Sequence, residues 1–372
     1  MRILLVTDQY APAIGGIETL LRQVARELAD RGHALEVLTG SQAQARDRRQ
    51  QIDGITVHRV DLVRALSRRD PFAVATERAR ARAVVDAFRP DLIHAHDAGP
   101  VLWAVAGRGT PTLITIHTSL GIYEHSQIAP MARQIGACDW VTCVSQAVLD
   151  EVVAVAPSVA PRASVIVNGV PVGPLPPAPS RVTRRIAAVG RMAPSKGFDV
   201  LVRAFALIAA HDPRVELELI GDGPARAEIA ALVDRLGLTR RVAMPGTIRH
   251  RDVADVLARA SVVAIPSRWE GMPLVALEAG RAARPVVATP VQGLGEVVID
   301  QVTGLLVPVD DAAALAGALA ELLDDPDRAA ALGAEGHARV TAEYSLGTAV
   351  AAYEALYAEL ATDRASAAAP AH

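Results

Sequence analysis

The amino-acid sequence predicts an α/β protein of two Rossmann-like domains, each a doubly wound parallel sheet covered by helices. Three observations predict this class. Short apolar runs alternate with helix-spaced apolar patterns through residues 2–170, and a stretch with five prolines, PVGPLPPAPS at 171–180, interrupts them. The same alternation restarts at residue 184. Because the prolines fit neither a helix nor a central strand, we expect a stiff linker between two domains that face each other across a cleft.

The first half contains seven expected strands. They lie at 2–7, 34–39, 55–60, 91–96, 112–117, 139–145 and 162–170. Apolar residues at helical spacing between Leu20 and Leu28 predict a first helix, which Gly32 ends, and further helices are expected near 72–89 and 146–156. Strands that alternate with helices predict a parallel sheet, so residues 1–170 should form one domain.

The second half repeats the pattern. Strands are expected at 184–190, 215–221, 241–246, 261–266, 285–289 and 304–308, and helices at 198–210, 224–236, 250–259, 273–283, 311–324 and 327–340. We therefore predict a linker at 171–183 and a second domain at 184–344. A terminal helix at 345–363 should pack back towards the first domain, and residues 364–372 should be a disordered tail.

Composition narrows the classes of function. The chain has 372 residues, of which 51% are apolar and 3% aromatic. Its net charge of -3 does not suggest a general nucleic-acid binder. We expect no spanning helix and no signal peptide, since the first residues form a strand. Cys138 and Cys143 show no disulfide or zinc spacing and are expected to be buried thiols in a reducing cytoplasm.

One residue stands out by its rarity. Among 38 basic residues Lys196 is the only lysine. Composition alone leaves open whether it is a chance surface residue or marks a site that needs a compact ammonium. Its neighbourhood favours a site, because Arg191 and Lys196 lie in a loop that follows a strand and precedes a helix. A helix N-terminus with two cations beside it is suited to phosphate.

A second motif follows the strand at 261–266. Glu270 lies in the loop after this strand, and Glu278 lies eight residues later in the next helix. Gly271 allows the backbone to approach a ligand, and Pro273 suits the first helical turn. Paired carboxylates accept hydrogen bonds from hydroxyls, which suits a polyol; the plainer interpretation is a loop Glu and a Glu paired with an Arg.

These motifs together resemble a known family. Arg191 and Lys196 in GRMAPSKG, with Glu270 and Glu278 in E-x7-E, are similar to the retaining glycosyltransferases of family 4 (glycosyl transferases group 1), which have the GT-B fold. The resemblance covers essentially the whole chain. Further segments agree with it: Gly15-Gly16-Ile17-Glu18, His117 in TIHTS, Ser145 in CVSQA, Asn168-Gly169-Val170 and Gly221-Asp222-Gly223-Pro224.

The resemblance implies roles for individual residues. Arg191 and Lys196 would bind the diphosphate of a UDP- or GDP-hexose, Glu270 would hold sugar hydroxyls, and Glu278 would bind the ribose. Arg191, Lys196 and Glu270 would be the catalytic residues. Other positions assigned to the donor are Gly16, Thr247, Ile248, Gly271, Met272, Pro273 and Leu274. The sugar and acceptor cleft would be lined by Tyr10, Gly15, His96 and His117.

The implied chemistry is electrostatic. Positive groups aimed at the leaving diphosphate would lower the barrier, and the resemblance implies that this phosphate helps to deprotonate a hydroxyl acceptor. No Asp-x-Asp signature follows any of the expected strands, so no metal or other cofactor is expected, and no catalytic base is assigned. A monomer would suffice. We expect Lys196→Ala to remove turnover and to spare the fold.

Other features are set aside. His94 and His96 face one side of a strand, but no third metal ligand is evident. Gly15-Gly16 lacks the spacing of a dinucleotide fingerprint and would otherwise be a simple turn. Residues 44–90 contain 11 arginines and 6 acids. We favour a solvated helix there; the alternative is a patch, with Arg46, Arg48, Arg49, Arg64, Arg68, Arg69, Arg78 and Arg82, that contacts anionic lipid.

Two rival functions stay open. One is a sugar-nucleotide epimerase or hydrolase of similar architecture, which would consume a nucleotide sugar without an acceptor. The other is a non-catalytic subunit that binds nucleotide sugars. The leading hypothesis is a cytoplasmic hexosyltransferase that retains the anomeric configuration. If the arginine patch contacts anionic lipid, the enzyme would also lie at the inner face of the cell membrane.

Overall fold

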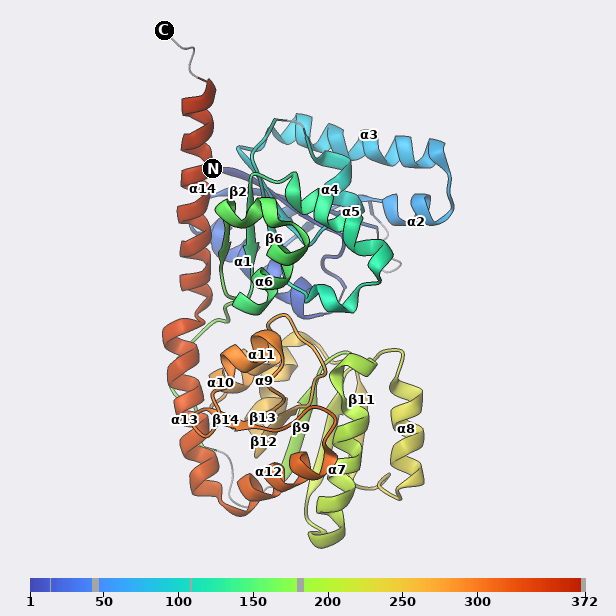
Figure 1. Cartoon of the computed structure of the whole chain (residues 1–372), viewed down its shortest axis with the longest axis vertical. Coiled ribbons are helices and arrows are strands. Elements are labelled where there is room, and N and C mark those ends of the chain that lie inside the picture. Colours follow the sequence, from blue (N-terminus) through green and yellow to red (C-terminus); the bar gives the residue numbers. More distant parts are fainter. Residues whose placement is uncertain (14, 42–46, 108, 179–183, 369–372) are drawn as a thin grey trace. The chain divides into compact units, whose positions relative to one another are not determined.

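The chain divides into two compact units, each described by itself (Figure 1). The computed structural model describes residues 1–13, 15–41, 47–107, 109–178 and 184–368. The first unit comprises Met1–Asn168 and Leu346–His372, and the second comprises Gly169–Ser345. Residues 171–178 of the expected linker belong to the second unit, and 179–183 lie outside the described residues. The predicted doubly wound α/β class is confirmed for each unit.

The first unit contains an eight-stranded sheet with the order β3-β4-β2-β1-β5-β6-β7-β8. All neighbours are parallel except β3 and β4, which are antiparallel. Strand β3 was not predicted, because its residues RQQI carry no apolar pattern. The strands are β1 (Arg2–Thr7), β2 (Ala34–Gly40), β3 (Arg49–Ile52), β4 (Ile55–Val60), β5 (Leu92–His96), β6 (Thr112–Ile116), β7 (Trp140–Cys143) and β8 (Ala163–Val165).

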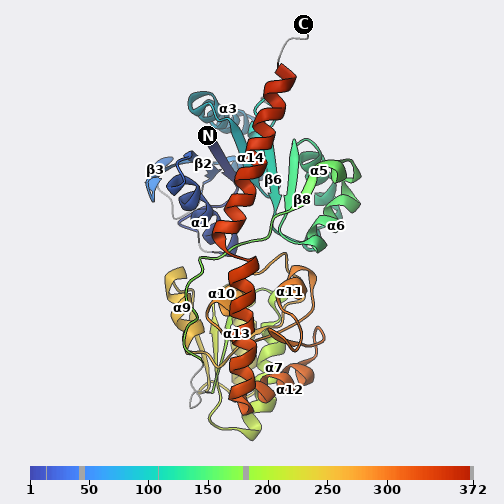
Figure 2. The ribbon, with the colours of Figure 1, turned by 90° about the vertical axis from the view of Figure 1, so that its left-hand side faces the viewer.

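Helices cover both faces of this sheet. One face packs against α3, α4, α5 and α6 through a buried aliphatic core that includes Leu4, Val6 and Ile93. The terminal helix α14 contacts α1 and reaches β5 on the other face (Figure 2). The helices are α1 (Gly16–Asp30), α2 (Leu62–Ser67), α3 (Pro71–Phe88), α4 (Pro100–Val105), α5 (His125–Gly136), α6 (Gln146–Val155) and α14 (Leu346–Ala368), with 3-10 turns η1 (Leu120–Ile122) and η2 (Pro157–Arg162).

Two expectations for the first unit need comment. The disordered tail predicted from residue 364 is wrong for 364–368, which continue α14. Alanine is the strongest helix former, so an alanine-rich end can prolong a helix that is already anchored. Cys138 and Cys143 are both buried and free, as expected. None of the helices in the described part of the chain is both long and apolar enough to cross a bilayer.

The second unit contains a six-stranded parallel sheet with the order β11-β10-β9-β12-β13-β14. Its strands are β9 (Arg185–Val189), β10 (Glu216–Ile220), β11 (Val242–Gly246), β12 (Val262–Ile265), β13 (Val286–Ala288) and β14 (Gly304–Leu306). Its helices are α7 (Phe198–His211), α8 (Arg226–Arg235), α9 (His250–Arg259), α10 (Leu274–Arg281), α11 (Gln292–Val297), α12 (Ala312–Asp324) and α13 (Pro326–Glu343), with the 3-10 turn η3 (Pro194–Lys196). Helices α7, α8 and α12 share one apolar core with the sheet.

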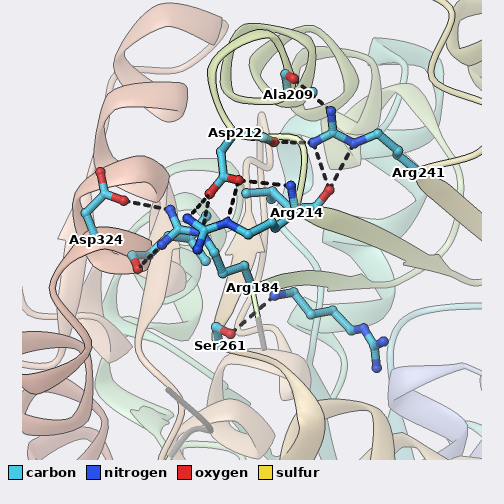
Figure 3. Close-up of polar contacts among 10 residues, drawn as sticks. Arg184, Ala209, Asp212, Arg214, Arg241, Ser261 and Asp324 are labelled. Atoms are coloured by element: carbon cyan, nitrogen blue, oxygen red, sulfur yellow. Dashed lines mark hydrogen bonds and ion pairs between the residues drawn. The ribbon is translucent and has the colours of Figure 1, made fainter. Parts of the chain in front are cut away.

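Arginines at the amino ends of these strands form ion pairs and hydrogen bonds with the ends of neighbouring helices (Figure 3). Arg184 contacts Asp212 at 2.5 Å and Asp324 at 2.6 Å, so it joins the end of α7 to the end of α12. Arg241 donates to the carbonyl oxygens of Ala209 and Asp212 at 2.7 and 2.5 Å. These contacts lie at the edge of the sheet opposite to the loops that follow the strands, so they support the frame of the unit.

The strand order locates the ligand-binding edge of each sheet. In the second unit the chain winds from β9 to β10 and β11 on one side, then returns to β12, β13 and β14 on the other. The order therefore reverses between β9 and β12, and ligands of open α/β sheets bind at the carboxyl ends of the strands at such a point. In the first unit the corresponding point lies between β1 and β5.

Candidate functional site

The loop after β9 turns sharply before α7. Pro194–Lys196 form the 3-10 turn η3, and Gly197 follows with a φ of +63°, in the left-handed region that favours glycine. A Cβ atom at Gly197 would lie 2.0 Å from the carbonyl oxygen of Pro266, which follows β12. The backbone N–H of Arg268 also donates to the carbonyl of Ser195 at 2.7 Å. Glycine therefore lets the loop after β9 pack directly on the loop after β12.

This packing brings Lys196 onto Glu270. The ammonium donates to Oε1 of Glu270 at 2.6 Å and to Oε2 at 2.7 Å. Glu270 is 7% exposed, whereas the side chain of Lys196 is 27% exposed. The sequence analysis assigned these two residues to different parts of the donor, and the structure places them in one ion pair at the β9–β12 switch point.

Three further side chains hold Glu270 in place. Ser267 Oγ donates to Oε1 at 2.6 Å, and the backbone N–H of Glu270 donates to Oε1 of Gln292 at 3.1 Å. Thr289 Oγ1 in turn donates to the carbonyl of Ser267. Ser267 and Thr289 are buried, and Gln292 is half-buried. Ser267 therefore holds the carboxylate, and Gln292 and Thr289 from the loop after β13 hold the backbone that carries it, which keeps a binding group in one orientation.

Arg268 fixes the opposite side of the same loop. Its guanidinium donates to both oxygens of Asp199, at 3.1 and 2.9 Å, and its Nε donates to Asp310 at 2.7 Å. It also donates to the carbonyl of Pro194. Asp199 lies in the first turn of α7. One planar guanidinium thus joins η3, α7 and the loop after β14, and Lys196 lies at the centre of the segment that it holds.

Arg191 occupies the same loop but behaves differently. It is exposed, and no ion pair or hydrogen bond of its side chain is present within the described residues. A long exposed cation two residues after a parallel strand can turn towards an anion at the strand's carboxyl end. The structure therefore leaves Arg191 available for an anionic ligand.

Glu278 lies apart from the ion pair and has its own partner. It is buried in α10, and burial raises its pKa to about 7, with Arg281 opposing the shift. The Nδ1 atom of His250, at the start of α9, is 3.5 Å from Oε1 of Glu278. Glu278 is therefore poised to accept hydrogen bonds from hydroxyls and to change its charge near neutral pH.

The remaining donor positions lie in the segments that lead into α9 and α10. Thr247 and Ile248 lie between β11 and α9, the latter being half-buried. Gly271, Met272 and Pro273 are buried ahead of α10, and Leu274 begins that helix. Pro273 is the residue before the helix and not part of its first turn, which corrects the sequence-based placement by one position. These segments all follow strands and therefore belong to the ligand-binding edge.

In the first unit the structure brings His96 and His117 together. His96 Nδ1 lies 2.9 Å from His117 Nε2, and both residues are buried. Burial lowers the pKa of His96 well below its usual value and that of His117 to about 4, so both rings are neutral. His96 Nε2 has no partner among the described groups. Either ring nitrogen of this contact can be the donor, depending on the tautomer that each ring adopts.

Acidic residues lie at the switch point of the first unit. The Asp97 carboxylate accepts from the N–H of His117 at 2.9 Å, and Asp8 accepts from the N–H of Val101 at 3.1 Å. Burial raises the pKa of both, that of Asp97 to about 7, to which the charges of Asp8 and Glu18 add. Two buried carboxyl groups beside paired imidazoles form a polar site suited to hydroxyl groups.

The other positions predicted for the first unit are dispersed along the β1–α1 segment. Tyr10 is 1% exposed, and burial raises its pKa to about 12. Gly15 precedes α1 in an extended conformation, and Gly16 begins that helix. Gly15 and Gly16 therefore lie at a helix N-terminus, whereas the Tyr10 side chain is enclosed.

The His94–His96 pair does not form a metal site in this structure. His94 contacts Tyr357 of α14 through Nδ1 at 2.6 Å and Thr115 through Nε2 at 2.7 Å, so both of its nitrogens are engaged. No group of three or more His, Cys, Asp or Glu side chains suited to a metal occurs in the described ranges. The role of His94 is to join α14 to the sheet.

Sequence reasoning missed several residues of the site. Ser267, Arg268 and Gln292 contact Glu270 or its loop, and Asp199 and His250 contact Arg268 and Glu278. Ser267 and Arg268 directly precede the E-x7-E motif, so their closeness to Glu270 in the sequence could have indicated that they belong to the site. Asp199, His250 and Gln292 lie in the first turns of other helices, and no sequence pattern indicates that they contact the motif.

Comparisons with known proteins agree with this geometry. Residues 14–174 match the model of Glycosyltransferase Family 4, and residues 183–325 match that of Glycosyl transferases group 1. D-inositol 3-phosphate glycosyltransferase of Thermobispora bispora is 31% identical, over 93% of this chain and 90% of that protein.

Solved structures show the same architecture. Sucrose-phosphate synthase from Thermosynechococcus elongatus has a TM-score of 0.84 at 25% identity, covering 97% of this chain and 99% of that one. HepE from Anabaena, in complex with UDP-glucose, has a TM-score of 0.79 at 21% identity, covering 96% of this chain and 100% of that one. With both halves matched in order and the switch-point motifs in place, the chain belongs to glycosyltransferase family 4 and has the GT-B fold.

Proposed function

We propose that this protein transfers a hexosyl unit from UDP- or GDP-hexose to a hydroxyl acceptor, with retention of anomeric configuration and without a metal. The observation that carries the proposal is the Lys196–Glu270 pair at the β9–β12 switch point. A cation in contact with a carboxylate matches a ligand in which an anionic phosphate adjoins hydroxyl groups. A sugar diphosphate has this arrangement, because the sugar is joined directly to the phosphate.

The hydrogen-bonding capacity of the pair leaves room for such a ligand. An ammonium has three donors, and Lys196 uses two on Glu270. An ionised carboxylate has about four acceptor positions, of which Lys196 and Ser267 fill three. One donor for phosphate and one acceptor for a sugar hydroxyl therefore remain, side by side. Arg191, exposed on the same loop, adds a second cation for the diphosphate.

These groups suit the chemistry of transfer. The bond between the anomeric carbon and the diphosphate oxygen breaks, and its electron pair stays on the phosphate. A bond forms from the acceptor oxygen on the same face of the sugar, and the acceptor's proton passes to the leaving phosphate. Lys196 and Arg191 stabilise the negative charge that develops, and removal of one such preorganised donor typically lowers kcat by about 10²–10³.

Glu278 supports the nucleotide part of the proposal. A buried carboxylate beside His250 offers acceptors to ribose hydroxyls. The solved structure of HepE holds UDP-glucose, which makes a UDP-hexose the first donor to test. Tyr10, Gly15, Gly16, His96 and His117 are proposed to serve the sugar and acceptor side.

Binding is tested first. We expect UDP- or GDP-hexoses to raise the Tm of the protein, and ADP-ribose, a diphosphate without a hexose, to raise it less. The Arg191→Ala variant should lose most of this shift, whereas Arg203→Ala, an exposed arginine of α7 in the same unit, should keep it. If no nucleotide sugar raises the Tm, the proposed function is wrong.

Turnover and stereochemistry are tested next. Released nucleoside diphosphate is measured with and without a panel of hydroxyl acceptors in the presence of EDTA, and the anomeric proton of the product is examined by NMR. We expect release that depends on acceptor and an axial product from an axial donor. Release without acceptor would instead indicate the hydrolase or epimerase, and binding without release would indicate a non-catalytic subunit.

A further inference from the structure

The side of the first unit formed by α2, α3 and α4 exposes an unusual set of apolar side chains. Phe72 is 85% exposed, Val63 49%, Leu66 41% and Trp103 37%. Helices α2, α3 and α4 contact one another (Figure 1), and Leu66 of α2 and Trp103 of α4 line one groove. We call Val63, Leu66, Phe72 and Trp103 the apolar patch. A nearly fully exposed phenylalanine at a helix start is unfavourable in water unless something covers it.

Arginines surround the apolar patch. Residues 61–82 contain six arginines and three acidic residues, an excess of three positive charges in a chain whose net charge is -3. Arg64, Arg68 and Arg69 are exposed on and just after α2. The nearby acids are already engaged: Asp70 caps α3, and the buried Glu77 pairs with Arg48 and Arg80. Asp61 lies 3.8 Å from Arg64, which is a weak exposed pair.

Apolar and charged residues together line a groove of about 550 Å³ on this surface. The lining includes the apolar Leu66, Val74 and Trp103 and the charged Arg69, Asp70 and Arg78. The guanidinium of Arg78 is 4.5 Å from the centre of the Trp103 ring. An indole held by a cation, beside an open apolar groove, resembles the arrangement of side chains that settle at the boundary between lipid headgroups and acyl chains.

We propose that this surface docks onto a bilayer that contains anionic lipids. Phe72, Val63 and Leu66 enter the boundary between headgroups and acyl chains, while Arg64, Arg68 and Arg69 contact headgroup phosphates. A second copy of the chain fits less well, because a twofold contact would set the arginines of the two copies against each other. Single-stranded nucleic acid would stack on the rings of Phe72 and Trp103 but would leave Val63 and Leu66 uncovered, because they offer no ring on which a base can stack.

The proposal does not depend on sugar transfer, so binding to vesicles tests it alone. We would measure co-sedimentation of the full chain with vesicles of phosphatidylcholine, and of phosphatidylcholine with phosphatidylglycerol, at low and high salt. We expect binding to the anionic vesicles that weakens as salt rises. Equal binding to both kinds of vesicle, or binding to neither, would overturn the proposal.

Variants locate the surface. Phe72→Ser should weaken binding to anionic vesicles at least tenfold, and the triple change Arg64→Gln, Arg68→Gln, Arg69→Gln by about a hundredfold, since each arginine near such a surface contributes about fivefold. The matched control is Arg203→Gln with Leu207→Ser, an exposed arginine and an exposed leucine of α7 in the second unit. Circular dichroism checks that each variant is folded.

Two results would contradict the assignment of this surface. One is equal loss of vesicle binding in the control and in the patch variants. The other is a concentration-dependent dimer of the wild-type chain, seen by analytical ultracentrifugation, that the Phe72→Ser variant does not form, together with no binding of the wild-type chain to anionic vesicles. That second result would make the apolar patch a contact between copies of the chain.

Discussion

The ammonium of Lys196 lies 2.6 and 2.7 Å from the two carboxylate oxygens of Glu270, although 74 residues separate them in the chain. Glu270 is the more buried partner, so removal of Lys196 alone leaves a buried carboxylate without its cation. Such a loss is destabilising, by about 3–5 kcal/mol in fully buried pairs. We therefore expect Lys196→Ala to destabilise the fold, unlike the expectation from the sequence. The role of the pair is better tested with the double variant Lys196→Met, Glu270→Gln, which leaves no buried charge without a partner.

Arg268 is expected to be a positioning residue for Lys196. Arg268→Lys cannot reach Asp199, Asp310 and the Pro194 carbonyl at once, because an ammonium lacks the planar fork of a guanidinium. We expect kcat to fall about tenfold with a smaller change in KM. Because Arg268 no longer holds η3, the rate at which an acylating reagent modifies the Lys196 amine should change as well.

The matched control is Arg185→Lys. Arg185 pairs with Glu216 at 2.8 Å at the amino end of β9, away from the loops that follow the strands. This variant should keep both the kcat and the acylation rate of Lys196. A kcat for Arg268→Lys that equals that of Arg185→Lys would show that Arg268 has only a structural role.

Gly197 should tolerate no side chain. Gly197→Ala would set a Cβ atom 2.0 Å from the Pro266 carbonyl oxygen and hold a left-handed φ of +63°. Gly237→Ala is the control, because Gly237 has a φ of +69° and nothing within 4 Å of a Cβ. The conformational penalty of about 1–2 kcal/mol applies to both variants. Only Gly197→Ala should lower the Tm further and abolish turnover; equal Tm values for the two variants would refute the close approach of the two loops.

Glu278 should make stability depend on pH. Its folded pKa of about 7 exceeds the ordinary value of 4.5 because the side chain is buried. Below pH 4.5 both states hold the proton. Between pH 4.5 and 7 the unfolded chain releases it while the folded chain keeps it, so stability falls as pH rises, and above pH 7 the loss is constant at about 3 kcal/mol.

Glu278→Gln removes that dependence. Relative to the wild-type protein, the variant should gain stability at pH 8 and much less at pH 5, as measured by the Tm at the two values. A Tm difference that is the same at both pH values would contradict the raised pKa. If ribose hydroxyls bind the ionised carboxylate, a UDP-hexose should also release protons near pH 7 in calorimetry with two buffers, and Glu278→Gln should abolish the release.

The sequence predicted what depends on local pattern and missed what depends on packing. Apolar periodicity located nearly all the strands, and the motifs located Lys196, Glu270 and Glu278. The polar edge strand β3 and the helical residues 364–368 were missed, since neither has an apolar period. Contacts such as that of Arg268 with Asp199 arise only when β9 and β12 pair in the sheet. The spacing of residues along the chain does not encode that pairing.

The central claim is that Lys196 contacts the donor diphosphate, and selective acylation tests it most directly. Because Lys196 is the only lysine of the sequence, its Nζ is the only lysine amine, and the α-amino group of Met1 serves as an internal reference in this chain. The rates at which a mild acylating reagent modifies each amine are measured by mass spectrometry, with and without a saturating UDP- or GDP-hexose that calorimetry shows to bind. We predict that the donor slows acylation of Lys196 at least tenfold and leaves the Met1 amine unchanged. Equal rates at Lys196 with and without the bound donor would contradict the claim.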